Sequence, residues 1–143
     1  MHTIKIAETD ADIASTFAVM SQLRTKIAEA DYVPLVRKQM ARGYLVAYVV
    51  DDGKVVAAAG FKQAVSLAWG EHIYVDDLVT DDKTRSKGHG TALMKWLLDY
   101  GRKQGCRELH LDSGVQRFAA HRFYLRERMD ITCHHFQMPI PPS

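Results

Sequence analysis

The chain has 143 residues, of which 47% are hydrophobic and 25% are charged, and its formal net charge is +2 at pH 7. These values are typical of an ordinary globular protein, so we expect a single domain over residues 1–143 with no linker. The small net charge, without a basic run or a basic patch that contains aromatic residues, argues against nucleic acid as a partner.

The N-terminal segment MHTIKIAETD lacks the apolar core of a signal peptide, and no run of about eighteen apolar residues is present to cross a membrane. We therefore expect a cytoplasmic protein with no membrane partner, in which the two cysteines, Cys106 and Cys133, are reduced. No metal site is expected. Cys106 and His110 lie four residues apart on an expected strand, which separates their Cα atoms by about 13 Å, and the adjacent His134 and His135 would point to opposite faces.

The first expected elements are a strand at Thr3–Ala7 and a helix that Asp10 or Asp12 caps. The segment Tyr32–Pro34 is then expected to break the chain, and its proline suits the first turn of a second helix that reaches Met40. The apolar residues that define the first helix are Phe17, Met20, Leu23 and Ile27.

A β-hairpin is expected next. Strands at Tyr44–Val50 and Val55–Val65 flank the turn Asp51–Lys54, whose Asp-Gly pair is the strongest hairpin signal in the sequence. A third antiparallel strand, Glu71–Thr80, follows through a short connection that contains a Trp-Gly pair.

The second half of the chain alternates helices and strands. Apolar residues recur at helical spacing over Gly90–Gln104, and the strand Arg107–Asp112 follows. A further helix is expected at Arg117–Arg128, before a last strand at Ile131–Met138. A strand–helix–strand unit places its two strands parallel, so we expect a mixed α/β fold with a central, mostly antiparallel sheet flanked by helices.

A basic, glycine-rich segment, Arg85–Gly90, connects an expected strand to the helix that follows it. The first amides of a helix have no intrahelical partners and the helix dipole adds partial positive charge, so such an end binds phosphate oxygens. The two glycines of the segment let the backbone approach an anion, while Arg85 and Lys87 add charge. A dinucleotide fingerprint would need a glycine where Leu93 stands, and no Walker A sequence is present.

Together with the preceding VDDLVTDD, the segment RSKGHGTAL resembles motif A of the GNAT superfamily of acetyl-CoA-dependent N-acetyltransferases, whose pattern is Arg/Gln-x-x-Gly-x-Gly/Ala. Cys106–Gly114 resembles the next strand of that family. Ala119–Met129 resembles its next helix, in which an alanine precedes a tyrosine by four residues. The resemblance implies the GNAT fold over nearly the whole chain. It also implies transfer of an acetyl group from acetyl-CoA to a primary amine of a small molecule or peptide, by direct attack in a ternary complex.

The resemblance further implies where acetyl-CoA binds. In this family the strand before motif A is bulged and pairs with the pantetheine arm, which places the amide of Leu78 near the acetyl carbonyl. The pyrophosphate lies on the amides of residues 86–91. The cofactor-binding residues implied in this way are Leu78, Val79, Thr80, Arg85, Ser86, Lys87, Gly88, His89, Gly90 and Thr91.

Tyr124 stands where many members of the family hold the tyrosine that donates a proton to the leaving sulfur, which implies a catalytic role. The chain also departs from the family pattern at two places. Arg117 stands where an asparagine commonly contacts the cofactor, so the resemblance implies that this arginine could reach a phosphate instead. The helix ends in Arg128-Met129 rather than Gly-Phe, so it lacks the usual left-handed glycine.

Asp76 is expected to be the general base that takes a proton from the amine. Side chains alternate along a strand, so Asp76 would share a face with Tyr74 and Leu78 while Asp77 faces away. The alternative is that Asp76 only attracts a cationic amine. The other candidates for the base are Glu71 and His72.

Two classes of acceptor, amino-sugar phosphates and peptide amines, are equally compatible with the sequence. A second hypothesis is a non-catalytic acyl-CoA-binding sensor of the same fold, and a third is an interaction domain that binds no nucleotide. Dimers are common in this fold, so a homodimer is the assembly that the resemblance implies. The expected substrate contacts are Arg24, Tyr32, Arg37, His134 and His135.

Overall fold

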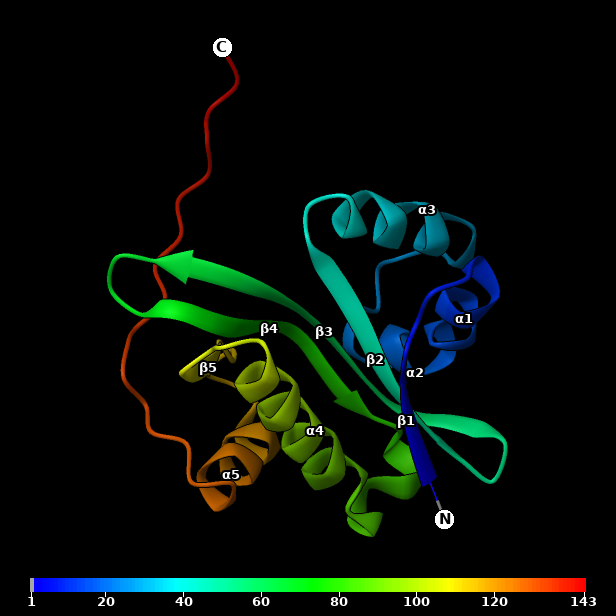
Figure 1. Cartoon of the computed structure of the whole chain (residues 1–143). Helices are drawn as coiled ribbons and strands as arrows, with labels where there is room; N and C mark the ends of the chain where they lie inside the picture. Colours follow the sequence, from blue (N-terminus) through cyan, green and yellow to red (C-terminus); the bar gives the residue numbers. More distant parts are fainter. Residues whose placement is uncertain (1) are drawn as a thin grey trace. The chain divides into compact units, whose positions relative to one another are not determined.

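The structure, a computed structural model, describes residues 2–143, with Ser86 described by its backbone alone, and divides the chain into two compact units, Met1–Leu111 and Asp112–Ser143. The elements of the first unit appear in Figure 1. In chain order they are β1 (His2–Ile6), α1 (Asp10–Ser15), α2 (Phe17–Leu23), α3 (Glu29–Met40), β2 (Tyr44–Asp51), β3 (Lys54–Ser66), β4 (Gly70–Thr80), the 3₁₀ helix η1 (Asp82–Lys87), α4 (His89–Lys103) and β5 (Glu108–Leu111).

The five strands of the first unit form one sheet in the order β1-β2-β3-β4-β5. The first three pairings are antiparallel, and β4 pairs with β5 in parallel. The parallel pairing follows from the crossover through α4, because a strand that returns by a helix runs in the same direction as its predecessor. The expected mixed α/β fold with a mostly antiparallel sheet is confirmed.

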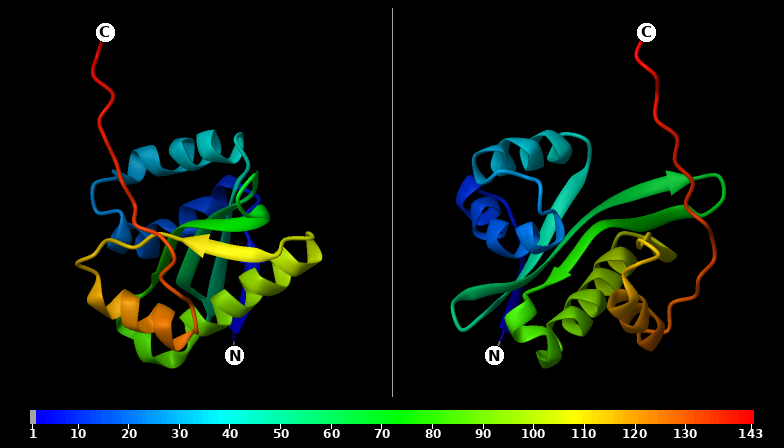
Figure 2. Two further views of the ribbon diagram at one scale, coloured as in Figure 1. Left: turned by 90° about the vertical axis from the view of Figure 1, so that its left-hand side faces the viewer. Right: turned by 180° about the vertical axis from the view of Figure 1, so that it is seen from behind.

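Helices cover both faces of this sheet, α1–α3 on one face and α4 on the other, as both views of Figure 2 show. The first face holds a core that includes Ile13, Val36 and Val46. The second face holds Phe61 and Leu97, both fully buried. The sheet therefore lies between two apolar cores, and successive side chains along a strand point alternately into one core and the other.

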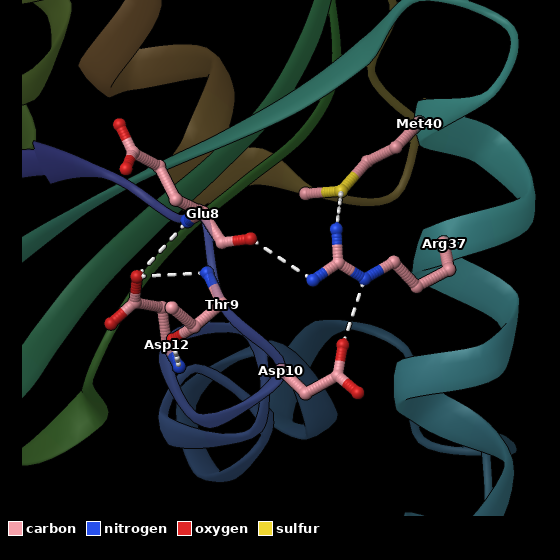
Figure 3. Close-up of polar contacts among 6 residues, drawn as sticks. All are labelled: Glu8, Thr9, Asp10, Asp12, Arg37 and Met40. Carbon is pink, nitrogen blue, oxygen red and sulfur yellow. Dashed lines mark hydrogen bonds and ion pairs between the residues drawn. The ribbon is translucent and has the colours of Figure 1, made fainter.

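Thr9 and Arg37 hold the turn between β1 and α1, although Thr9 was not expected to cap the helix and Arg37 was expected to contact substrate. Thr9, not Asp10 or Asp12, is the N-cap of α1, and Asp12 completes a capping box with it. Arg37 of α3 donates one hydrogen bond to the Glu8 carbonyl (3.0 Å) and another to the Asp10 carboxylate (2.8 Å), as Figure 3 shows. Arg37 therefore fastens α3 to this turn.

The helix expected to run as far as Ile27 is instead two short helices that end at Leu23. The break lies at Thr16, whose Oγ1 donates to the Ile13 carbonyl (2.7 Å). Because that proton is used, the Tyr32 hydroxyl donates to Thr16 Oγ1, also at 2.7 Å. A buried threonine that bonds back to its own helix interrupts the helical pattern, and no local propensity predicts this.

Pro34 does not begin a helix as expected. α3 starts at Glu29, so Pro34 lies in its second turn, where it leaves the Ala30 carbonyl without the usual helical donor. Burial of Tyr32 and Val36 on the sheet outweighs that loss.

The β2–β3 hairpin and the strands around it agree with the sequence prediction. Asp52 (φ 51°) and Gly53 (φ 74°) both have the positive φ of a type I′ turn. α4 begins at His89, one residue earlier than expected. No helix within residues 2–143 combines the length and apolar character needed to span a membrane.

The second unit contains α5 (Phe118–Arg126), and none of residues 112–143 forms a strand. The strand expected at Ile131–Met138 is therefore wrong. Ile131 and Phe136 are 79% and 89% exposed, and this unit offers no other strand whose backbone could pair with the segment. An alternating apolar pattern cannot form a strand without such a partner.

Candidate functional site

The edge of β4 is open over its second half. Pairing between β4 and β5 ends at Val75 and Leu111, whereas β4 continues to Thr80. In the described pairing, residues 77–80 therefore have partners on β3 only. Backbone groups on an open strand edge can pair with another extended chain or an amide-bearing ligand.

A bulge lies where this open edge begins. Gly60 of β3 pairs with Asp77 and Phe61 pairs with Val75, so Asp76 has no partner in the register. The extra residue breaks the alternation of side chains. The expectation that Asp76 shares a face with Leu78, and that Asp77 faces away from both, is wrong. Leu78 packs against the core that α4 covers, whereas the Asp76 carboxylate meets Lys62, which follows Phe61 of that core and so lies on the opposite face.

Asp77 points toward the face that α1–α3 cover, where two residues occupy its carboxylate. The Tyr44 hydroxyl donates to Asp77 Oδ2 (2.6 Å), and Arg24 Nε donates to Oδ1 (2.7 Å). Arg24 Nη2 also donates to the Asp76 carbonyl (2.8 Å), which pins the bulge. Burial and the Asp77 charge raise the pKa of Tyr44, so the phenol keeps its proton. Tyr44 carried no signal in the sequence that could have assigned it to this site.

Gly60 explains how Tyr44 comes so close to the strand. A Cβ at Gly60 would clash with the Tyr44 ring, so only glycine leaves room for the phenol to cross β3 at the bulge. Gly60 therefore sets the position of the hydroxyl that binds Asp77.

Asp76 differs sharply from its neighbour. Its Oδ2 atom is buried and has no hydrogen-bond partner among the described residues. The nearest cation that the structure shows is Lys62 Nζ, at 3.7 Å, which is too long for a hydrogen bond. Burial raises the pKa of Asp76 above its usual range, the Asp77 charge adds to the rise, and Lys62 and Arg24 oppose it. Asp76 is thus a carboxylate with an unsatisfied oxygen and increased basicity.

The other two candidates for the base are engaged elsewhere. Glu71 accepts a hydrogen bond from Gln63 Nε2 (3.1 Å). His72 is buried, with Nδ1 2.8 Å from the Gly70 carbonyl, so Nδ1 carries the proton and donates it. The Trp69 ring packs edge-on against the His72 imidazole. These contacts favour a structural role for both residues.

The basic segment after β4 forms the short helix η1 instead of a plain loop. Asp81 caps it by accepting from the Lys83 amide (3.1 Å), which is also the main reason that the pKa of Asp81 is lowered. Gln22 of α2 donates to Asp81 and accepts from the Asp82 amide. The entry to the segment is therefore fixed, while Arg85 and Lys87, near its end, are exposed.

Gly88 joins η1 to α4 with φ +80°, and among the described residues beyond its chain neighbours none has an atom within 4 Å of where its Cβ would be. The first backbone bond of α4 runs from the Ala92 amide to the Gly88 carbonyl (3.0 Å), so the helix itself does not use the amides of His89 and Gly90. The segment thus offers amides that α4 itself does not use, open space and positive charge, as an anion site requires. Of Ser86 only the backbone is described, so its side chain lies outside the described part.

His89 does not present its side chain to that space. It is only 3% exposed, and its Nε2 lies 3.0 Å from Asp51 Oδ2 at the β2–β3 hairpin. The bond to His89 is the main reason that the pKa of Asp51 is lowered. Only the backbone of His89 is available to a ligand at the helix start, while its ring ties α4 to the hairpin.

Two predicted site residues, Arg117 and Tyr124, belong to the second unit. Arg117 is the N-cap residue of α5, without a side-chain cap. Burial raises the pKa of Tyr124 and the Arg117 charge opposes the rise. Within this unit His121 Nε2 also lies 2.8 Å from the Gly114 carbonyl. The helix therefore carries a phenol that stays protonated at neutral pH.

The expected substrate contacts are mostly engaged in structural interactions. Arg24 binds Asp77, Tyr32 binds the break between α1 and α2, and Arg37 binds α1 and the turn before it. His135 Nδ1 lies 2.8 Å from the Asp112 carboxylate, and His134 is exposed. Over residues 2–143 no group of three or more His, Cys, Asp or Glu side chains is placed to hold a metal ion.

Comparisons with known proteins bear on what such a site does. Residues 13–129 match the family model described as Acetyltransferase (GNAT) family. The chain is 35% identical over 112 residues to a curated protein named Uncharacterized N-acetyltransferase YhdJ from Bacillus subtilis (strain 168), a match that covers 78% of this chain and 79% of that protein.

Two solved structures share the fold. One is a transcriptional regulator from Bacillus halodurans C-125, with a TM-score of 0.85 and 18% identity, covering 98% of this chain and 100% of that one. The other is the aminoglycoside N-acetyltransferase AAC(6')-Iy in complex with CoA, with a TM-score of 0.84 and 12% identity, covering 98% and 95%. These likenesses show the fold, and the family match confirms the resemblance that motif A predicted. The chain belongs to the GNAT family of acetyltransferases.

Proposed function

We propose that the protein binds acetyl-CoA and transfers its acetyl group to a primary amine of a small molecule or peptide, by direct attack in a ternary complex. The observation that carries the proposal is the continuity of the open β4 edge at residues 76–80 with the amides at the start of α4 that the helix itself does not use. A ligand that has both peptide-like amides and a diphosphate fits these two features, with its amides along the β4 edge and its diphosphate at the start of α4. The complex of the related aminoglycoside N-acetyltransferase with CoA supports the same ligand.

The proposed cofactor site uses backbone groups more than side chains. Leu78, Val79 and Thr80 would pair with the pantetheine amides along the β4 edge. The diphosphate would be held by the amides of residues 86–91, with Arg85 and Lys87 adding charge. Arg117 of the second unit remains a proposed contact to a phosphate. When bound, acetyl-CoA supplies the thioester that carries the acetyl group.

The proposed chemistry needs one group that takes a proton and one that gives a proton. Asp76 takes a proton from the ammonium of the acceptor, because its raised pKa brings it closer to neutral pH than an ordinary carboxylate and its Oδ2 lacks a donor. Tyr124 gives a proton to the departing sulfur, since its raised pKa keeps the phenol protonated. The amide of Leu78 would donate to the acetyl oxygen as negative charge develops there.

The test combines binding with turnover. Calorimetry with CoA should show saturable binding, and a panel of primary amines should contain at least one that accelerates release of free thiol from acetyl-CoA. A protein that binds CoA but releases no thiol with any amine would be a non-catalytic sensor. A protein that binds no CoA would exclude both the enzyme and the sensor and leave an interaction domain.

A further inference from the structure

Lys62 places an amine of the chain itself beside Asp76. It lies on β3 opposite Tyr74, and its Nζ is 3.7 Å from Asp76 Oδ2. The Lys62 side chain is 45% exposed and that of Asp76 is 30% exposed. The separation exceeds hydrogen-bond distance, so this ion pair does not fix the ammonium in one position. The lysine is therefore accessible and free to move on its four-carbon stem.

The charges around Asp76 direct an ammonium to this carboxylate rather than to its neighbour. Arg24 and Tyr44 occupy the two oxygens of Asp77. Asp76 Oδ2, in contrast, is buried and has no hydrogen-bond partner among the described residues. The two neighbouring carboxylates thus differ in function, because only Asp76 retains an oxygen that can accept a proton from an amine.

The open edge of β4 begins at the same residue. Leu78, whose amide is the proposed donor to the acetyl oxygen, is two residues from Asp76, or roughly 6–7 Å along an extended strand. Lys62 reaches the Asp76 carboxylate from the neighbouring strand, and Asp76 precedes this amide by two residues. These positions bring together an amine, a base and the proposed place of the thioester.

We propose that Lys62 is an acetyl acceptor, so that the protein acetylates its own Lys62 with acetyl-CoA. This inference rests on the proposed function. Asp76 takes one proton from the Lys62 ammonium, and the neutral Nζ attacks the acetyl carbon. A C–N bond forms and the C–S bond breaks. Tyr124 gives its proton to the leaving thiolate and regains one from the nitrogen, and Asp76 passes its own proton to water. The products are Nε-acetyl-lysine, free CoA thiol and one proton.

Modification of Lys62 has a consequence for the site. Acetylation removes the positive charge that lies nearest to Asp76 and opposes the rise in its pKa. The carboxylate then remains protonated to higher pH, which slows proton removal from any further amine at low pH. Self-acetylation would therefore limit the enzyme's own activity.

The experiment incubates the full chain with acetyl-CoA and follows intact mass and peptide maps over time. Lys62 should acquire one acetyl group at least tenfold faster than Lys54, an exposed lysine on the same strand that serves as the internal control for chemical acylation. The rate per molecule should not depend on protein concentration. Asp76→Asn should abolish the difference between the two lysines while CoA binding persists, and Lys62→Arg should leave no site with the faster rate.

Several results would overturn the inference. Equal rates at Lys62 and Lys54, or an unchanged rate in Asp76→Asn, would show chemical acylation. A rate that rises with protein concentration would place the reaction between copies. If the wild-type chain binds CoA and acetylates a small amine but not Lys62, this inference fails and the proposed function stands, whereas failure to bind CoA removes both.

Discussion

The Tyr44 hydroxyl donates a 2.6 Å hydrogen bond to Asp77 Oδ2 and holds that carboxylate on the face of the sheet that α1–α3 cover. Arg24 occupies the other oxygen of Asp77, so this residue serves the structure. Its neighbour Asp76 is displaced by the bulge and keeps an unsatisfied oxygen. Two adjacent, chemically identical side chains are thus assigned different roles by their surroundings, one fixing the strand and the other available for proton transfer.

Tyr44→Phe tests the structural half of this relationship. The Asp77 side chain is only 12% exposed, so loss of the Tyr44 hydroxyl leaves one of its carboxylate oxygens mostly buried without a hydrogen-bond donor. We expect the free energy of unfolding, measured by urea denaturation, to fall by about 1–3 kcal/mol. Tyr100→Phe is the matched control, because the contacts shown for Tyr100 are ring contacts with Phe61 and Trp96, which phenylalanine keeps. Equal losses in the two variants would contradict the importance of the Asp77 bond.

Gly88→Asp tests the proposed diphosphate site. The new carboxylate would project into the open space at the start of α4 and repel a diphosphate, so CoA affinity should fall at least tenfold, or about 1.4 kcal/mol. Gly105→Asp is the control, since Gly105 has nearly the same φ (+81° against +80°) and similar open space but follows the other end of α4. Calorimetry should show normal affinity in the control. Normal affinity in Gly88→Asp would place the diphosphate elsewhere.

The pH dependence of acetylation of a small amine tests Asp76 as the base. A base must be ionised, so kcat/KM should rise with pH through the pKa of Asp76, which burial places above the usual carboxylate range. Lys62 opposes that shift, so Lys62→Met should move the rise to higher pH, and Lys54→Met should leave it in place. If kcat/KM of Lys62→Met rises at the same pH as that of the wild type, another group is the base.

Tyr124→Phe tests the proposed proton donor. Phenylalanine keeps the ring in place but cannot protonate the leaving sulfur, so we expect kcat to fall about tenfold to a hundredfold. CoA affinity should be unchanged, because the Tyr124 hydroxyl is not among the proposed cofactor contacts. A variant with normal kcat, or one in which affinity and kcat fall together, would give Tyr124 a structural role only.

Local sequence signals predicted the parts of the fold that depend on local chemistry. The Asp52-Gly53 pair gave the hairpin because its turn needs two positive φ angles, and the apolar spacing of residues 90–104 gave α4. The break at Thr16 and the continuation of α3 through Pro34 depend on tertiary contacts of Tyr32 and Val36, which spacing does not encode.

The candidate site also combines a feature that local sequence predicts with one that depends on contacts between strands. The glycine-rich start of α4 was recognisable because its function depends on backbone conformation, and only a few residue types permit that conformation. The bulge at Asp76 was not recognisable, because it arises from the register against Gly60 on another strand. Strand alternation therefore assigned Asp77 and Leu78 to the wrong faces, although it pointed to the carboxylate that the structure leaves unsatisfied.

The end of α5 offers a stability test that is independent of catalysis. Arg128 has φ +67°, a left-handed conformation that glycine adopts without strain, and its amide donates to the Leu125 carbonyl (3.0 Å). Arg128→Gly should relieve about 1 kcal/mol of backbone strain. Arg122→Gly is the control, because Arg122 is exposed in the interior of α5 and glycine there should destabilise the helix by about 1 kcal/mol. Hydrogen exchange of the α5 amides should slow in the first variant and accelerate in the second. Faster exchange in both would mean that Arg128 contributes a contact worth more than its strain.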